Sequence, residues 1–450
     1  MYIDDRELYK KIARIAMPIS IQGLVSGTLG LIDTLMVGML GEAELAAVGV
    51  ATQIFFVHYL FLYGFNSGAA TFMAQFYGIR NWKNIRRVVG FSVVVSGIIS
   101  AAFLMIAVFW TSDFLKIYSN DPNIIKMAAP YVHIGAVTLL FLSVSVPLET
   151  VFKAIQKTRI PMVVSVVAFS ANTFINYILI FGKFGAPEMG LSGAAVGTAI
   201  ARGLEMIISV IALKHTKIGK GGSIREFIDW NRELVRRIIK NSLPTTLNEL
   251  FWSVGTSMYV AAFSRLGVTS YAAYQAAAAI DNIFAFAAFS IGDSALIMVG
   301  ERLGSGNKEG AYYMAKKLLK VGVIVGSVCG VILIIGGRPV INLFALSANG
   351  KKYAFKVLVV LACLMPWSLF VNINVTGIMR GGGDTAFAAA TEIAVIWAYA
   401  VPMAFMASMF FGLPVYLAVL CVRSSSVIES FILGKRFFSR KWTNTVIKNL

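Results

Sequence analysis

Long runs of apolar residues constrain this chain more than any other feature. A membrane-spanning helix needs about 20 predominantly apolar residues, and runs of that kind follow one another along most of the 450 residues. Charged residues make up only 14% of the chain, whereas soluble domains carry about 25%. The sequence therefore predicts an all-α membrane protein with twelve transmembrane helices, near residues 12–39, 46–76, 88–110, 127–152, 161–181, 190–213, 236–264, 271–300, 318–337, 357–379, 387–409 and 413–434.

Basic residues are distributed unequally between the two sides of these predicted helices. An even number of spans places both termini on one side, which carries 30 of the 40 Lys and Arg residues, while the other side carries eight. Because short cytoplasmic loops are enriched in Lys and Arg, both termini are predicted to be cytoplasmic, in a multi-pass protein of the cell (plasma or inner) membrane. The basic loops beside the membrane account for the net charge of +18. We therefore expect no nucleic-acid partner.

The two halves of the chain resemble each other when the sequence is shifted by 226 positions. Three segments of the first half then align without a gap on three of the second: LYKKIARIAMP (8–18) on LVRRIIKNSLP (234–244), LGEAELAA (40–47) on LGVTSYAA (266–273), and YGIRN (77–81) on LGSGN (303–307). Each half contains six spans, so both halves have the same orientation. This predicts two pseudo-symmetric six-helix bundles, as in transporters built from parallel repeats.

The predicted domains are an N-terminal six-helix lobe at 1–214, a cytoplasmic linker at 215–232 and a C-terminal six-helix lobe at 233–450. The linker is polar and contains glycine, as expected of a segment that joins two moving bundles. Pro18 and Pro244 occupy equivalent points in the first span of each half. A proline inside a helix frees a carbonyl and permits a bend, so each marks either a hinge or a tolerated kink.

Eight acidic residues lie within the predicted spans, and Arg202 and Arg423 are the two bases that the counts for the two sides leave out. Ionisable groups within a membrane are costly and usually face an interior cavity. The spacing predicts that Glu149 pairs with Lys153 and that Glu205 pairs with Arg202. Three deep acids have no such neighbour in sequence, namely Asp33, Glu249 and Asp281. The remaining acids are Asp293, Glu392 and Glu429, and the second arginine is Arg423.

Asp33 is predicted to be the centre of a cation site. A rise of 1.5 Å per residue places it roughly 10 Å below the outer edge of the first span. Asn172 and Asn176, one turn apart on the fifth span, and Thr198 on the sixth are expected at a similar depth. Such oxygen donors suit a small hard cation such as Na⁺, and Asp33 alone suits a proton. The alternative is that the amides and the hydroxyl only cross-link helices.

Glu249 and Asp281 are predicted to form a second, looser acidic locus at mid-depth in the C-terminal lobe. A carboxylate in a cavity of low dielectric attracts an organic cation and is neutralised by a proton. These two residues are therefore candidates for substrate binding and coupling, by exchange of a proton or metal ion for the exported cation.

Several functional classes find little support in the sequence. It has no phosphate-binding G-x-x-x-x-G-K-[ST] loop and no H-E-x-x-H motif, and its three histidines are scattered. The three cysteines lie inside apolar runs without metal-type spacing. We therefore expect no enzyme, no catalytic residue and no cofactor beyond a coupling ion, Na⁺ or H⁺.

Four segments resemble the multidrug and toxic compound extrusion (MATE) transporters: LIDTLMVGMLGEAELAAVGV (31–50), LNELFWSVG (247–255), LGSGN (303–307) and GIMRGGGDT (377–385). The resemblance covers essentially the whole chain. It implies a two-lobed antiporter that exports lipophilic, usually cationic compounds in exchange for Na⁺ or H⁺. By the same resemblance, Asp33, Asn172, Asn176 and Thr198 match the family's cation site, and Pro18 matches a proline associated with bending of the first helix.

The chain departs from the family pattern at two positions. Some relatives carry a second acid where this chain has Asn176, so a two-carboxylate proton site is absent here. The seventh-span acid of several relatives lies further beyond the proline than Glu249 lies beyond Pro244. We expect a cation-coupled exporter that acts by alternating access as a monomer, with small lipophilic cations and the lipid bilayer as its partners. The alternative is a flippase for lipid-linked oligosaccharides, whose pyrophosphate cargo requires a cavity rich in Arg and Lys.

Overall fold

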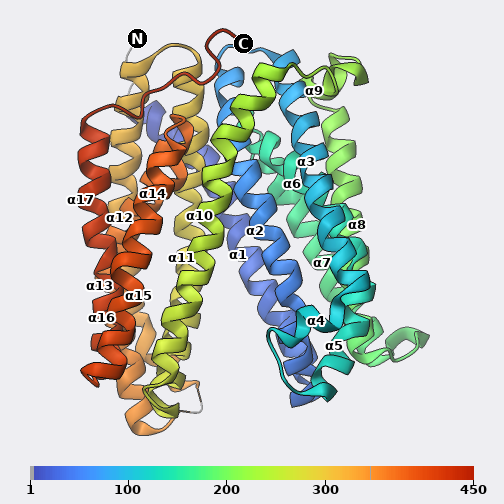
Figure 1. Ribbon diagram of the computed structural model, residues 1–450, viewed down its shortest axis with the longest axis vertical. Helices are drawn as coiled ribbons and strands as arrows, with labels where there is room; N and C mark the ends of the chain where they lie inside the picture. The colour runs from blue at the N-terminus through green and yellow to red at the C-terminus, as the bar shows by residue number, and fades with distance from the viewer. Residues whose placement is uncertain (1–4, 345) are drawn as a thin grey trace. The chain divides into compact units, whose positions relative to one another are not determined.

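The computed structural model describes residues 5–344 and 346–450, without the side chains at positions 27, 29–31 and 286–288. Within these ranges every regular element is a helix (Figure 1). The helices of the first half are α1 (Asp5–Gly38), α2 (Glu42–Gly78), α3 (Trp82–Phe109), α4 (Thr111–Lys116), α5 (Pro122–Gly135), α6 (Val137–Ala154), α7 (Arg159–Phe181), η1 (Lys183–Gly185) and α8 (Gly190–Lys214).

Two short helices, α9 (Lys217–Lys220) and η2 (Ile224–Phe227), precede the second half. Its long helices are α10 (Arg232–Ser264), α11 (Val268–Gly304) and α12 (Lys308–Asn342). The last three spans are each interrupted by a change of helical pitch or a break: α13 (Ala348–Asn372) with η3 (Ile373–Met379); α14 (Thr385–Val395) with η4 (Ile396–Ala400), α15 (Val401–Phe405) and η5 (Met406–Phe410); and α16 (Val415–Arg423) with α17 (Ser425–Phe438).

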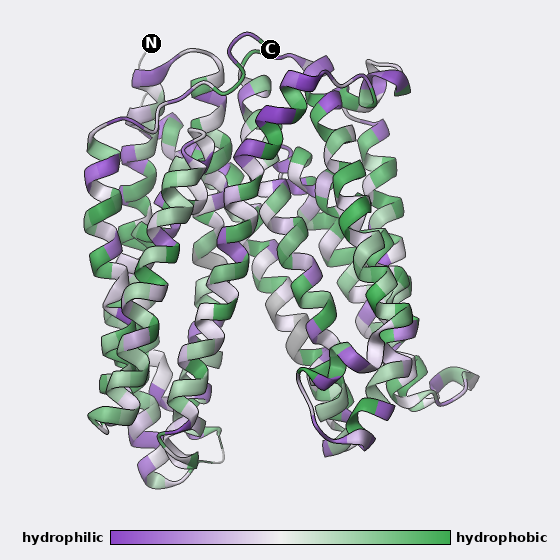
Figure 2. Cartoon of the chain, in the orientation of Figure 1, coloured by the Kyte–Doolittle hydropathy of each residue, from purple (hydrophilic) through white to green (hydrophobic). Residues whose placement is uncertain are grey.

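These helices confirm the predicted fold class of twelve transmembrane helices. Ten helical runs of the described chain are long and apolar enough to cross a membrane, and α1 and α10 complete the layout with 34 and 33 residues. Most helices extend beyond the predicted spans, because hydropathy detects only the apolar part of a helix that continues into its polar ends. Figure 2 shows hydrophobic residues along the helices and hydrophilic residues gathered toward the ends of the helices.

The repeat of 226 positions also appears in the backbone. α1 and α10 end at Gly38 and Ser264, and both following helices end at a glycine, Gly78 and Gly304. Residues Arg80 and Gly306 then both take left-handed backbone conformations, with φ of 57° and 80°. Asn81 and Asn307, the next residues, accept a backbone N–H bond at the start of α3 and α12. The two halves therefore repeat their turns and caps as well as their helices.

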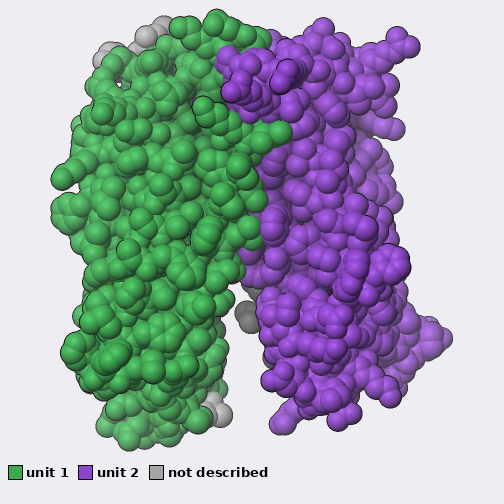
Figure 3. Space-filling model, in the orientation of Figure 1, with its two compact units in different colours: residues 1–20, 239–450 green, residues 21–238 purple. Residues whose placement is uncertain are grey.

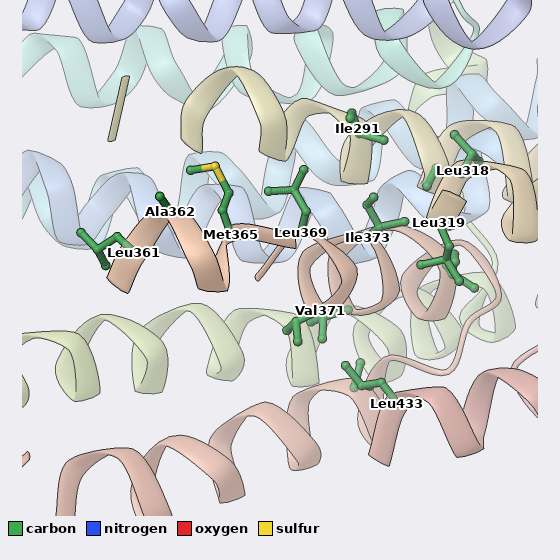
Figure 4. Packing of buried hydrophobic residues seen from close by; sticks show 14 of the residues in the cluster. Ile291, Leu318, Leu319, Leu361, Ala362, Met365, Leu369, Val371, Ile373 and Leu433 are labelled. Carbon is green, nitrogen blue, oxygen red and sulfur yellow. The ribbon is translucent and has the colours of Figure 1, made fainter. Parts of the chain in front are cut away.

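The chain divides into two compact units, coloured separately in Figure 3. Unit 1 consists of residues 1–20 and 239–450, and unit 2 consists of residues 21–238. α1 thus contributes its first part to unit 1 and the rest to unit 2, and Pro18 lies close to the change. Each unit has its own apolar core, and Figure 4 shows part of that of unit 1, including Ile291, Leu318, Leu319, Leu361, Ala362, Met365, Leu369, Val371, Ile373 and Leu433.

Much of the segment predicted as a linker is held against α3 within unit 2. Arg86 Nε donates to Glu226 Oε2 at 2.5 Å, and Arg86 Nη1 donates to the carbonyl of Ile218 at 3.3 Å. Arg87 pairs with Asp229, and the hydrogen bond from Arg87 holds the pKa of Asp229 below its usual range. The backbone of η2 passes so close to Gly90 that a Cβ there would lie 1.8 Å from the Phe227 carbonyl oxygen.

Candidate functional site

Asp33 lies on α1 in unit 2, and its carboxylate faces amide groups of α7. Asn176 Nδ2 donates to Asp33 Oδ1 at 3.1 Å. Among the described residues, no Lys, Arg or His forms an ion pair with Asp33. The negative charge of this carboxylate is therefore met by a neutral amide.

Asn172 and Asn176 are both buried, with 4% and 1% of their surface exposed. Asn172 lies beside the same carboxylate as Asn176. In one orientation of its amide, Nδ2 donates to Thr198 Oγ1 at 3.3 Å. In the opposite orientation, Nδ2 lies 3.1 and 2.8 Å from the two oxygens of Asp33. The structure thus brings together all four residues predicted for the N-terminal cation site.

The position of Asn176 depends on close packing between α7 and α8. A Cβ at Gly197 of α8 would lie 2.0 Å from Asn176 Oδ1, and a Cβ at Gly193 would lie 2.7 Å from the backbone of Leu179. Glycines four residues apart allow helix backbones to approach closely in membranes. Asn176 Oδ1 is buried and has no hydrogen-bond partner in the part of the chain that the structure describes, which leaves one oxygen of the cluster able to accept a ligand.

Tyr131 of α5 is a further member of this cluster that was not predicted from the sequence. The Tyr131 side chain is 8% exposed and lies close enough to interact with Thr198 and with the charge of Asp33. No spacing rule connects α5 with α1, so only the packing of unit 2 reveals it. One carboxylate, two amides, a threonine hydroxyl and a phenol then provide oxygen atoms around a single negative charge, which matches a monovalent cation or a proton.

The two ion pairs predicted from helix spacing in unit 2 are confirmed. Lys153 Nζ lies 2.8 Å from Glu149 Oε1, and Arg202 Nη1 lies 2.7 Å from Glu205 Oε2. Glu149 also accepts a hydrogen bond from Gln22 of α1 at 3.0 Å. These acids are neutralised locally and differ in this respect from Asp33.

In unit 1, both predicted acids have basic partners from distant parts of the chain. Arg380, 1% exposed, lies 2.7 Å from Glu249, and Arg423 lies 3.8 Å from Asp281. Helix spacing indicates partners only at neighbouring positions of the same helix, so these distant arginines could not be predicted. Arg380 is a further base beside Arg202 and Arg423, and it lies one residue beyond the predicted tenth span.

Two other acids of unit 1 have no ion pair among the described residues. Asn248 Nδ2 donates to Glu392 Oε2 at 2.6 Å. Glu429 is 5% exposed, and its Oε1 finds no hydrogen-bond partner within the described residues. Within the described part of unit 1, Glu392 on α14 and Glu429 on α17 therefore lack the ion pairs that Glu249 and Asp281 have. The roles predicted for Glu249 and Asp281 stay predictions.

Pro18 lies inside α1 and Pro244 lies inside α10. Both helices continue past the proline. Their assignment as hinges stays a prediction, as do the lobe and linker boundaries.

A chain of twelve membrane-spanning helices in two repeated halves, with polar groups buried within them, has the architecture of a multi-pass membrane transporter. A family model, MatE, matches it twice, at residues 18–178 and 244–406, which together make up more than half of the chain. The two matches begin at Pro18 and Pro244 and so coincide with the internal repeat. The chain belongs to the MatE family.

Individual proteins are similar to this chain over nearly its whole length. The probable multidrug resistance protein NorM of Thermotoga maritima is 24% identical over 445 residues, 98% of this chain and 94% of the relative. The multidrug resistance protein MdtK of Edwardsiella ictaluri is 27% identical over 413 residues, 88% of this chain and 87% of the relative.

Solved structures share the fold. A MOP superfamily transporter from Pyrococcus furiosus superimposes with a TM-score of 0.86 at 17% identity, covering 96% of this chain and 97% of the other. A multidrug resistance MATE family transporter described in an outward-facing conformation gives the same TM-score, identity and coverage.

Proposed function

We propose that this chain is a cation-coupled antiporter that exports lipophilic cationic compounds, with Na⁺ or H⁺ as the coupling ion at Asp33. The observation that carries the proposal is the environment of this carboxylate. It is hydrogen-bonded by Asn176, lies beside the Asn172 amide and has no ion-pair partner among the described residues. A charge at this depth is costly unless a bound ion or proton cancels it.

The Asn172 side chain can present either its N–H group or its oxygen to Asp33, so a bound ion can take the place of the N–H group. With the Nδ2 group turned toward Asp33, the carboxylate receives two hydrogen bonds, at 3.1 and 2.8 Å. With the amide reversed, its oxygen faces the carboxylate, an arrangement that favours a cation between the two. Binding a cation therefore replaces hydrogen bonds that hold α1 to α7, and α1 is the helix that also contains Pro18.

The relatives are named multidrug resistance proteins, which supports small-molecule drugs as the cargo of this chain. A cationic cargo is supported by the excess of intramembrane acids, in particular Glu392 and Glu429, which lack an ion pair among the described residues. Release of the cargo is favoured when the coupling ion occupies the site in unit 2.

A flippase for lipid-linked oligosaccharides would need basic groups available to a pyrophosphate. Arg380 and Arg423 of unit 1, however, have acidic partners at 2.7 and 3.8 Å, and Arg202 of unit 2 has one at 2.7 Å. Their charge is already compensated, so the exporter is the better-supported function.

Efflux of ethidium from proteoliposomes, with a Na⁺ gradient and a pH gradient imposed separately, tests the proposal. We expect one gradient to drive efflux and Asp33→Asn to abolish it, because the amide neither binds a proton at neutral pH nor carries the charge that attracts Na⁺. Glu188→Gln, which removes an exposed carboxylate of the same unit, serves as the matched control and should retain efflux. Unchanged efflux in Asp33→Asn would refute the role of the site.

A further inference from the structure

We infer that unit 2 carries a binding site for the phosphate headgroup of an anionic lipid, in a cavity between α4 and α5. The cavity has a volume of about 820 Å³. The helices that line it, α4 and α5, lie at the end of unit 2 opposite to α9 (Figure 1), and in the chain they connect the α3 span to the α6 span. It shares no lining residue with the cluster around Asp33.

Helical geometry directs basic side chains from both helices into this cavity. On α5 the lining positions are 122, 125, 126, 129, 130 and 133, which form one face of a helix. That face presents Lys126 and His133 two turns apart. On α4 the lining residues Ser112 and Lys116 are one turn apart, and Asn120 follows in the loop. Two lysines, a histidine and two neutral polar side chains therefore line the same space.

The charge of this cavity favours an anion. Lys126 has no ion pair among the described residues, whereas Lys116 Nζ lies 2.9 Å from Asp113 Oδ1. The other nearby acid, Asp121, accepts a bond from the backbone N–H of Asn123 at 2.8 Å and so caps α5. His133 Nε2 lies 3.0 Å from Thr111 Oγ1. A phosphate group suits such a set, because it accepts several hydrogen bonds from cationic donors.

The surroundings of the cavity favour a lipid over a soluble phosphate. Ile125, Ala129 and Pro130 give it an apolar part. Beside α4, Phe109, Trp110 and Ile117 are 73%, 55% and 73% exposed. Exposed aromatic residues at the end of a membrane span are typical of the bilayer interface. A headgroup held by Lys116 and Lys126 would leave its acyl chains beside these side chains, within the hydrocarbon.

Native mass spectrometry of the purified full-length protein in detergent tests this site by counting bound lipids. We expect phosphatidylglycerol to be retained in preference to phosphatidylcholine. Loss of one charge-assisted hydrogen bond to a phosphate weakens binding about tenfold, so Lys116→Gln and Lys126→Gln should each weaken phosphatidylglycerol binding about tenfold. Asp113→Asn should strengthen it, because Lys116 then loses its competing carboxylate.

Lys183→Gln is the matched control, since it removes an exposed positive charge of unit 2 outside the cavity. Equal weakening by Lys183→Gln would overturn the proposal in favour of unspecific charge attraction. Equal retention of the two lipids would overturn it as well. Displacement of the lipid by millimolar inorganic phosphate would overturn the lipid assignment and indicate a soluble phosphate ligand. All variants change exposed side chains, so the folded protein remains available for each measurement.

Discussion

Asn176 of α7 packs its side-chain oxygen against Gly197 of α8, at a point where a Cβ would come within 2.0 Å of that oxygen. The same side chain donates its amide N–H to Asp33. One glycine on α8 therefore fixes the amide that faces the carboxylate on α1. Residues outside the ligand set can thus control the proposed cation site.

Gly197→Ala is expected to weaken the cation site without removing any of its ligands. The added methyl group pushes Asn176 away from Asp33, and loss of one such contact costs about 1.4 kcal/mol, a tenfold change. The cation concentration or proton concentration for half-maximal efflux should therefore rise about tenfold in proteoliposomes. Gly97→Ala on α3 is the control, because a Cβ there would meet no atom of the described residues within 4 Å. An unchanged half-maximal concentration in Gly197→Ala would contradict the positioning role.

Asn176→Asp is expected to change the pH dependence of transport. The new carboxylate would lie about 3 Å from Asp33, and two carboxylates at that distance cannot both be ionised, so the pair holds one proton up to a higher pH. Efflux measured between pH 5 and 9 should show its transition at least about one unit higher than in the unmodified protein. Asn176→Ala removes the amide without adding an acid and should lower efflux with no such displacement. If efflux by Asn176→Asp and by Asn176→Ala depended on pH in the same way, that result would argue against contact between positions 33 and 176.

The sequence predicted the fold well because its signals are local and repeated. Apolar runs locate membrane helices, and turns recur at fixed positions, as at Arg80 and Gly306, where each loop requires a left-handed residue. Asp33, Asn172, Asn176 and Thr198 could be grouped from depth alone, since helix rise converts sequence position into height in the membrane.

Partners in unit 1 could not be predicted in this way. Arg380 and Glu249 are separated by 131 positions, and depth does not reveal which helix faces which. The same holds for Tyr131, which reaches Thr198 only through the packing of α5 on α8. The docking of η2 on α3 was missed for another reason: polar, glycine-containing segments resemble flexible linkers until their contacts are known.

The buried pair of Arg380 and Glu249 is expected to contribute strongly to the stability of unit 1. Removing one partner of a buried pair leaves an uncompensated charge and costs about 3–5 kcal/mol. Arg380→Gln and Glu249→Gln should therefore each lower the Tm in detergent, and the double variant should lose less than the two single losses combined. The looser pair of Arg423 and Asp281, at 3.8 Å, offers a comparison with weaker coupling. Additive losses at Arg380 and Glu249 would show that the pair is not energetically coupled.

Gly90→Ala is expected to release the segment that precedes α10. A Cβ at position 90 would lie 1.8 Å from the Phe227 carbonyl oxygen and 2.6 Å from its carbonyl carbon, both backbone atoms that cannot rotate away. Overpacking of this kind costs about 1–3 kcal/mol, enough to increase opening of η2 about tenfold. Limited trypsin digestion should then cut after Arg225 about ten times faster than in the unmodified protein. Gly97→Ala, on the same helix but with open space around it, should leave the cleavage rate unchanged. Equal rates in Gly90→Ala and Gly97→Ala would mean that the close approach of η2 to α3 does not hold this segment in place.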